Sequence, residues 1–282
     1  MTSNARARFA LLVLALVPLA AAAADGIAFI TNLKGDITVD GSPRPLLMSE
    51  LAKGQKLVLG KEAQLSVMYI QSGKEYALRG PGEYAVGERE IASSMGLPPA
   101  ARETAWRASG DVLVKVSQTA AASIRMRSFA PAKVETKPRL EYPTRGAVAS
   151  LQPTLRWHAP DPKGAVDLTV VLAGASDAKP LHKARVSGAS WRVPARLKPD
   201  AEYQWTLTAG GVTLGSASFR TLPPAAQDRI DKRRPAEKAE FTDRLLFAML
   251  LQEVGAAQDA AEHWARLAQE RQDLPELASL AR

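Results

Sequence analysis

The sequence predicts a mainly β protein with an α-helical C-terminal tail. Short half-apolar segments that end at turn residues recur over residues 27–129. A second group of alternating apolar and polar segments fills residues 153–220, and residues 226–282 carry apolar side chains at helical spacing. We therefore expect two β domains followed by helices.

The first domain, residues 25–130, is expected to be a small twisted sandwich or barrel. Residues 37–39 run into Asp40-Gly41, a hairpin signal, because both residue types tolerate positive φ. Gly80-Pro81-Gly82 fixes a further turn. Strands are expected at 37–39, 56–59, 63–70 and 83–86, a short helix at 99–108, and two closing strands at 111–117 and 122–127.

About a third of the chain resembles the FecR-like periplasmic β domain of bacterial envelope proteins. The residues that carry the resemblance are Gly35, Leu51-x-x-Gly54-Gln55-x-Leu57-x-Leu59-Gly60, Ala63-x-Leu65, Ser72-Gly73-x-Glu75-Tyr76-x-Leu78 and Gly80-Pro81-Gly82. The resemblance implies a non-catalytic β module outside the cytoplasm. In that family the module is often the outer half of a membrane-spanning regulator, whereas no membrane helix or cytoplasmic half is expected here.

Residues 131–143 are expected to form a stiff extended connector, because Pro131, Pro138 and Pro143 punctuate a charged stretch. A second domain, residues 144–225, follows. Its order Pro153-x-Leu155-x-Trp157, then Tyr203-x-Trp205, then Phe219-x-Thr221 resembles fibronectin type III or Ig-like modules. The resemblance implies a β-sandwich with the aromatic side chains in its core; strands are expected at 153–157, 167–172, 190–193, 203–207 and 217–220.

The tail, residues 226–282, is expected to contain helices at 241–254 and 257–271, with a third at 274–280. Its order Phe247-Ala248-x-x-Leu251-x-x-x-Gly255, then Ala260-x-x-x-Trp264, resembles one tetratricopeptide-like hairpin. One such repeat does not bury its own faces. The first helix is apolar nearly all round, so a third surface must cover it. Either the β-sandwich or the short terminal helix covers it, or another chain does, by helix-in-groove packing or dimerisation. The candidate partner-binding residues are Leu246, Leu250, Leu251 and Trp264.

The N-terminus predicts export. Arg6 and Arg8 precede an apolar stretch at 9–20 and small residues up to Ala24, the order of a secretory signal that would be cleaved after Ala24. An uncleaved anchor is the alternative, but a membrane-spanning helix needs ~20 apolar residues. We expect a signal peptide at residues 1–24 and a periplasmic mature chain without a transmembrane anchor.

Little catalytic chemistry is indicated. The chain has no cysteine, which excludes disulfides, thiolate metal sites and cysteine nucleophiles. His158, His182 and His263 are far apart in sequence, and none lies beside a carboxylate motif. We expect no enzyme activity, no metal ion and no cofactor.

Residues 131–225, the connector and the second domain, carry nearly all of the positive charge that exceeds the negative charge in the mature chain. The clustered cations of the second domain either form an ordinary solvated surface or bind a polyanion such as peptidoglycan or another anionic glycan. The candidates are Lys179, Lys183, Arg185, Arg192, Arg196 and Lys198. Nucleic acid is not an expected partner of an exported protein.

The sequence thus predicts a non-enzymatic exported scaffold or adaptor, which binds one or more envelope proteins through the apolar tail. The alternative is a peptidoglycan or anionic-glycan binder that uses the basic face of the second domain. Raised salt separates the two, because it weakens polyanion binding and leaves apolar docking intact.

Overall fold

The structure is a computed structural model that describes residues 26–94, 96, 99–106, 138–158, 164–174 and 179–281. The described chain is mainly β with a short C-terminal helical region, as the sequence predicted. The predicted signal peptide, the predicted strands at 111–117 and 122–127, and the connector up to residue 137 lie outside the described residues.

The first β unit, residues 26–106, consists of two five-stranded sheets in the orders β10-β7-β6-β1-β4 and β3-β2-β5-β8-β9. A shared core of aliphatic side chains and Tyr69 and Tyr76 fills the space between them. The strands are β1 (Ala28–Lys34), β2 (Ile37–Val39), β3 (Ser42–Pro43), β4 (Glu50–Leu51), β5 (Lys56–Leu59), β6 (Gln64–Tyr69), β7 (Lys74–Arg79), β8 (Gly82–Val86), β9 (Ile91–Ser93) and β10 (Ala101–Glu103).

Turn chemistry sets the register of this unit. Asp40 and Gly41 both have positive φ, at 48° and 78°, and join β2 to β3 in the predicted hairpin. Gly80 is required by close packing, since a Cβ atom there would lie 1.8 Å from the carbonyl oxygen of Gly60. The prediction of a helix at 99–108 is wrong. Residues 101–103 form β10, which pairs with β7 at the edge of the sheet.

The second β unit also has two sheets, in the orders β11-β13-β16 and β12-β18-β17-β14-β15. Trp157, Trp205, Tyr203 and Phe219 lie buried between them, as the alternating pattern predicted. The strands are β11 (Arg139–Tyr142), β12 (Ala147–Val148), β13 (Thr154–His158), β14 (Ala165–Leu172), β15 (His182–Ser187), β16 (Ser190–Arg192), β17 (Glu202–Ala209) and β18 (Val212–Thr221).

Three of these strands were not predicted. Arg139–Tyr142 lies in the expected connector but pairs with β13, so this part of the connector belongs to the second unit. β15 was missed because its inward side chains, at 182, 184 and 186, include a histidine and an alanine, which weakens the apolar alternation. β12 spans only Ala147–Val148, which is too short for a pattern.

Four helices follow the second unit: α2 (Pro224–Arg233), α3 (Phe241–Glu253), α4 (Ala257–Glu270) and α5 (Pro275–Leu280). The last three match the predicted helices, and α2 was not predicted, because its mean hydropathy is low and only Gln227 and Ile230 are buried. Gly255, with φ of +84°, allows the sharp turn between α3 and α4. None of the helices in the described ranges is both long and apolar enough to cross a membrane.

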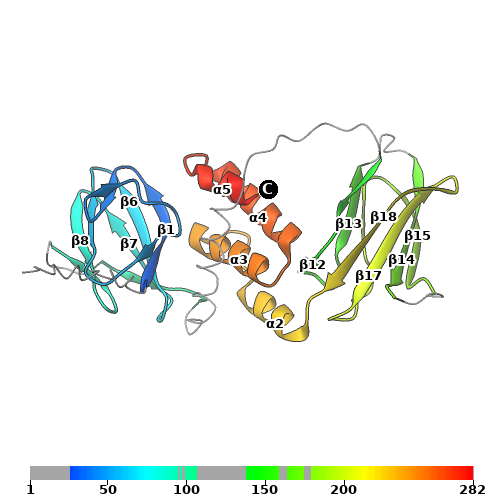
Figure 1. Ribbon diagram of the computed structural model, residues 1–282, viewed down its shortest axis with the longest axis horizontal. Helices are drawn as coiled ribbons and strands as arrows, with labels where there is room; N and C mark the ends of the chain where they lie inside the picture. Colours follow the sequence, from blue (N-terminus) through cyan, green and yellow to red (C-terminus); the bar gives the residue numbers. More distant parts are fainter. Residues whose placement is uncertain are drawn as a thin grey trace, which may run out of the picture.

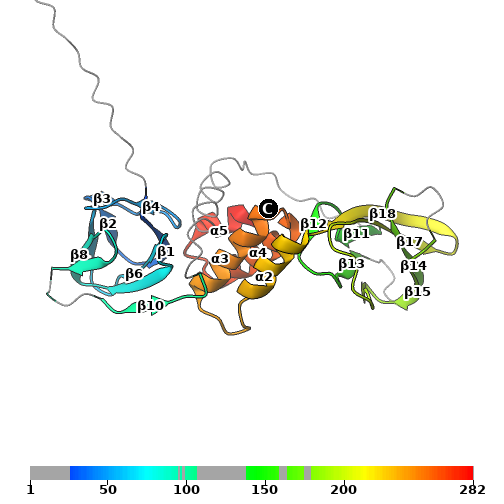
Figure 2. The same cartoon turned by 90° about the horizontal axis from the view of Figure 1, so that it is seen from below.

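The helices occupy the middle of an elongated molecule. In Figure 1 they lie between the first β unit and the second β unit, although they come last in the sequence. Figure 2, turned by 90°, shows the same arrangement. The C-terminal segment is therefore the central body against which both β units pack.

Candidate functional site

The four candidate partner-binding residues are buried within the chain. Leu246, Leu250 and Leu251 on α3 are 0% exposed, and Trp264 on α4 is 1% exposed. The interpretation that another chain docks on these four residues is therefore wrong, because the chain covers them by itself. Coverage within the chain is one of the two outcomes that the sequence predicts, but no sequence pattern indicates that the first β unit takes part.

One apolar cluster spans all three parts of the molecule. From the first β unit it takes Phe29, Leu47, Met48, Met68, Ile70 and Trp106, and from the second it takes Ala147 and Ala149. The remaining members are Leu222, which follows β18, and residues of α2–α5 and the turns between them. Because α3 is buried on every side, its all-round apolar pattern reflects a central position rather than a free docking face.

A buried polar network ties the first β unit to α3. The Glu75 carboxylate on β7 is 6% exposed and accepts hydrogen bonds from Thr31 Oγ1 at 3.0 Å and from the Thr242 hydroxyl. Arg102 on β10 donates from Nε to Glu75 Oε2 at 2.9 Å and from Nη1 to Asp243 Oδ2 at 2.8 Å. Residues from the three strands β1, β7 and β10 and from α3 thus share one cluster, in which Arg102 pairs with two carboxylates.

A second polar contact with the first β unit comes from the end of α4. Arg271 donates from Nη2 to the Leu33 carbonyl at 2.6 Å, and also to the Asn32 side chain. It also pairs with Asp273, at 2.7 Å. The Leu47 amide donates to Glu276 on α5 at 3.3 Å. These contacts bind the C-terminal end of the helical region to β1 and to the loop after β3.

The second β unit contacts the first turn of α4. Asp259 accepts from Tyr142 Oη at 3.0 Å and from the Ala149 amide at 3.2 Å. Burial raises the pKa of Asp259, while those two hydrogen bonds act in the opposite direction. Burial together with the Asp259 charge raises the pKa of Tyr142. The neighbouring Gln258 accepts from the Thr144 amide at 2.7 Å.

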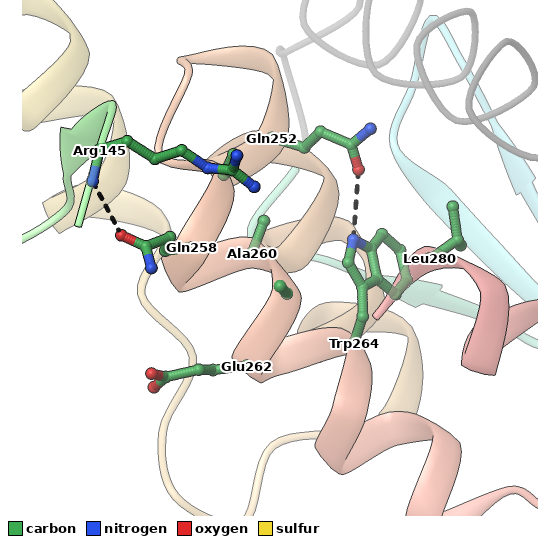
Figure 3. A pocket seen from close by; sticks show the side chains of 9 residues that line it. Arg145, Gln252, Gln258, Ala260, Glu262, Trp264 and Leu280 are labelled. Carbon is green, nitrogen blue, oxygen red and sulfur yellow. Dashed lines mark hydrogen bonds between the residues drawn. The ribbon is translucent and has the colours of Figure 1, made fainter. Parts of the chain in front are cut away.

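A cavity of about 320 Å³ opens beside this contact, between the loop before β12 and the helices α4 and α5. Figure 3 shows Arg145 reaching across the start of α4, with Trp264 and Leu280 on the opposite side. Trp264 Nε1 donates to Gln252 Oε1 at 3.3 Å, which fixes the indole at this edge. Sequence reasoning missed the cavity, because its walls come from positions far apart in the chain.

The six candidate polyanion-binding residues are all exposed. Lys183 and Arg185 alternate on β15 and share the outer face of the five-stranded sheet. Arg192 lies on the outer side of β16, in the three-stranded sheet. The outer faces of two packed sheets point away from each other. The structure therefore brings two of these cations together and places a third on the opposite face; Lys179, Arg196 and Lys198 lie in loops.

The histidines belong to three different elements. His158 ends β13, and His182 begins β15, where its ring lies 6.1 Å from that of Trp191. His263 on α4 packs edge-on against Phe247 at 5.1 Å. Burial and the nearby Arg266 and Arg234 lower the pKa of His263 to about 4. Within the described part of the chain, no cluster of three or more metal-ligating side chains is present.

No protein-family model fits the chain, and no curated protein is significantly similar to it. The proposed function therefore rests on the residues and contacts described above.

Proposed function

We propose that the protein is a non-enzymatic scaffold of the bacterial cell envelope that presents two β units to envelope proteins at a fixed spacing. The observation that carries this proposal is the apolar cluster that joins both β units through α2–α5. A flexible tether would let the two units move independently, whereas a shared core resists relative motion. Fixed spacing has a use where a partner must contact both units at once.

The same proposal includes the type of each module and its compartment. The first unit is a FecR-like domain, the second a fibronectin type III or Ig-like sandwich, and α3 with α4 a tetratricopeptide-like hairpin. The turn and strand residues quoted above, and the two-sheet core of each β unit, support these assignments. The periplasmic location rests on the residue pattern at 1–24.

The test is site-specific photo-crosslinking of the exported full-length protein in its host envelope. The crosslinking residue is placed either at Lys61, on the first β unit, or at Val212, which is 65% exposed on the second. The proposal expects the same envelope protein to be captured from both positions. Capture of unrelated proteins from the two positions, or from neither, would contradict it.

A matched pair of variants separates spacing from simple contact. Arg271→Ala removes the contacts with Asn32 and Leu33, whereas Arg79→Ala removes an exposed arginine from the same β unit. Capture should fall with the first variant and persist with the second. The full-length chain is used because removing the helices would uncover Met68 and Ile70.

The alternative function is binding of peptidoglycan or another anionic glycan by the second β unit. The observation that favours it is the exposed pair Lys183 and Arg185 on one sheet face. Sedimentation with purified peptidoglycan, at low and at high salt, tests it directly. Binding that is lost at high salt, and also lost in Lys183→Gln/Arg185→Gln, would favour the alternative over the scaffold.

A further inference from the structure

Arg145 brings an uncompensated positive charge to the cavity shown in Figure 3. Within the described part of the chain, its guanidinium makes no ion pair and no hydrogen bond. Its position is nevertheless fixed, because the amides of Thr144 and Arg145 donate to Gln258 Oε1 at 2.7 and 3.4 Å. Two hydrogen bonds to Gln258 thus hold the backbone at Arg145 in place, and the Arg145 side chain lines the cavity.

The other polar groups around the cavity are already engaged. Glu262 forms an ion pair with Arg156 and lies 3.9 Å from Arg266. Gln258 Nε2 donates to the Glu141 carbonyl at 3.3 Å, and Gln252 Oε1 accepts from Trp264. Of the two charged side chains that line the cavity, Arg145 alone has no counter-charge in the described part of the chain, which favours a negatively charged ligand.

The remaining walls are apolar and small. Ala257, Ala260 and Ala261 contribute methyl groups from α4, and Leu280 and the Trp264 indole close the other side. A volume of about 320 Å³ is at the low end of the range for small-ligand sites. It accommodates one or two small residues of an extended chain and excludes a folded domain.

We propose that this cavity binds the free carboxyl end of a short peptide that terminates in small apolar residues. The guanidinium of Arg145 matches a carboxylate in a two-point fork, and the methyl-lined wall takes the last side chains. A phosphate group would carry more negative charge than one arginine balances. This site is an addition to the proposed scaffold function. The tests of the scaffold function do not depend on whether the cavity binds a peptide.

The test is isothermal titration of the full-length mature protein with N-acetyl-Ala-Ala and with its C-terminal amide. We expect the free acid to bind and the amide to bind at least tenfold more weakly. The Trp264 indole N–H signal, assigned by Trp264→Phe, should shift with the free acid alone. Equal affinity for both compounds, or no binding of the acid at millimolar concentration, would overturn the site.

Substitutions locate the binding within the cavity. Arg145→Gln should weaken binding of the free acid at least tenfold, and Arg145→Lys should weaken it less. Arg79→Gln, which changes an exposed arginine of the first β unit, should bind the free acid as the parent does. Arg145→Gln should unfold at the parent temperature, because the side chain is exposed and unpaired. Undiminished binding by Arg145→Gln would place the ligand elsewhere and refute the proposal.

Two sources supply such a peptide end, and the stereochemistry of the probe distinguishes them. Protein C-termini contain L-residues, whereas the stem peptides of peptidoglycan end in D-alanine. Tighter binding of N-acetyl-L-Ala-L-Ala would indicate a protein partner, and tighter binding of the D,D form a cell-wall peptide. Inorganic phosphate serves as the third probe, and affinity for it equal to that for the peptides would contradict the carboxylate assignment.

Discussion

Glu75 shows how one residue joins two parts of the molecule. Its carboxylate is almost fully buried, yet it has partners on β1, β10 and α3. A buried carboxylate is tolerated only when it is paired and hydrogen-bonded. Sequence analysis placed Glu75 in the first domain as a motif residue, and only the folded arrangement shows its contact with the helices.

Replacing Glu75 with glutamine should lower the free energy of unfolding by about 2 kcal/mol, because the charge-assisted bonds from Arg102 are lost. Chemical denaturation measures this. The matched control is Glu83→Gln, whose ion pair with Lys56 is more than half exposed and should contribute less than about 1 kcal/mol. Equal effects of the two changes would refute the role of the buried network.

His263 should make stability depend on pH. Its pKa is about 4 in the folded chain and about 6.5 in the unfolded chain, so the unfolded state binds its proton first. The free energy of unfolding should therefore fall as pH drops from about 6.5 to about 4. In His263→Gln the same fall should be smaller, as urea titrations at four pH values would show. An unchanged pH profile in this variant would assign the dependence to other groups.

At the scale of single elements, the structure differs most from the prediction at α3, whose candidate docking residues are buried. Nine of its residues are buried, and they lie on all sides of the helix. The helix boundaries followed from the sequence, because the apolar run and Gly255 after it are local features. What covers the helix did not follow, because the covering residues Phe29, Met68 and Trp106 are distant in sequence and belong to a separate β unit.

Leu251→Ala should lower the free energy of unfolding by about 3 kcal/mol, because it leaves a cavity in a packed core. The control, Leu181→Ala, removes a side chain that is 50% exposed and should change stability by less than about 0.5 kcal/mol. Thermal and urea unfolding provide the measurement. If Leu251→Ala left stability intact, the side chain would not be the core residue described here.

In the second β unit, strands were predicted where alternation was strong and missed where it was weak. The strands around Trp157 and Trp205 carry large apolar residues at every second position. β11 and β15 do not, and β10 was taken for a helix because its three residues carry no strand pattern. The cavity at Arg145 lay beyond prediction for a different reason: its walls meet only after the second β unit docks on α4.

At the scale of the whole molecule, the order of parts in space differs from the order in sequence. The helices come last along the chain but lie between the two β units. Apolar contacts, the Glu75 network and Arg271 hold the first unit, while Asp259, Gln258 and Gln227 hold the second. The helical region therefore acts as a central clamp that packs against both β units. The two β units are not separate domains joined only by a linker.

The central claim is that this clamp fixes the two β units relative to each other. Because the natural chain has no cysteine, spin labels can be attached at Lys61→Cys and Lys198→Cys without removing native thiols. Pulsed electron paramagnetic resonance should give a single narrow distance distribution, unchanged in Arg79→Ala and broadened in Arg271→Ala. A broad distribution in the unmodified background, insensitive to Arg271, would show that the units move independently and would contradict the account.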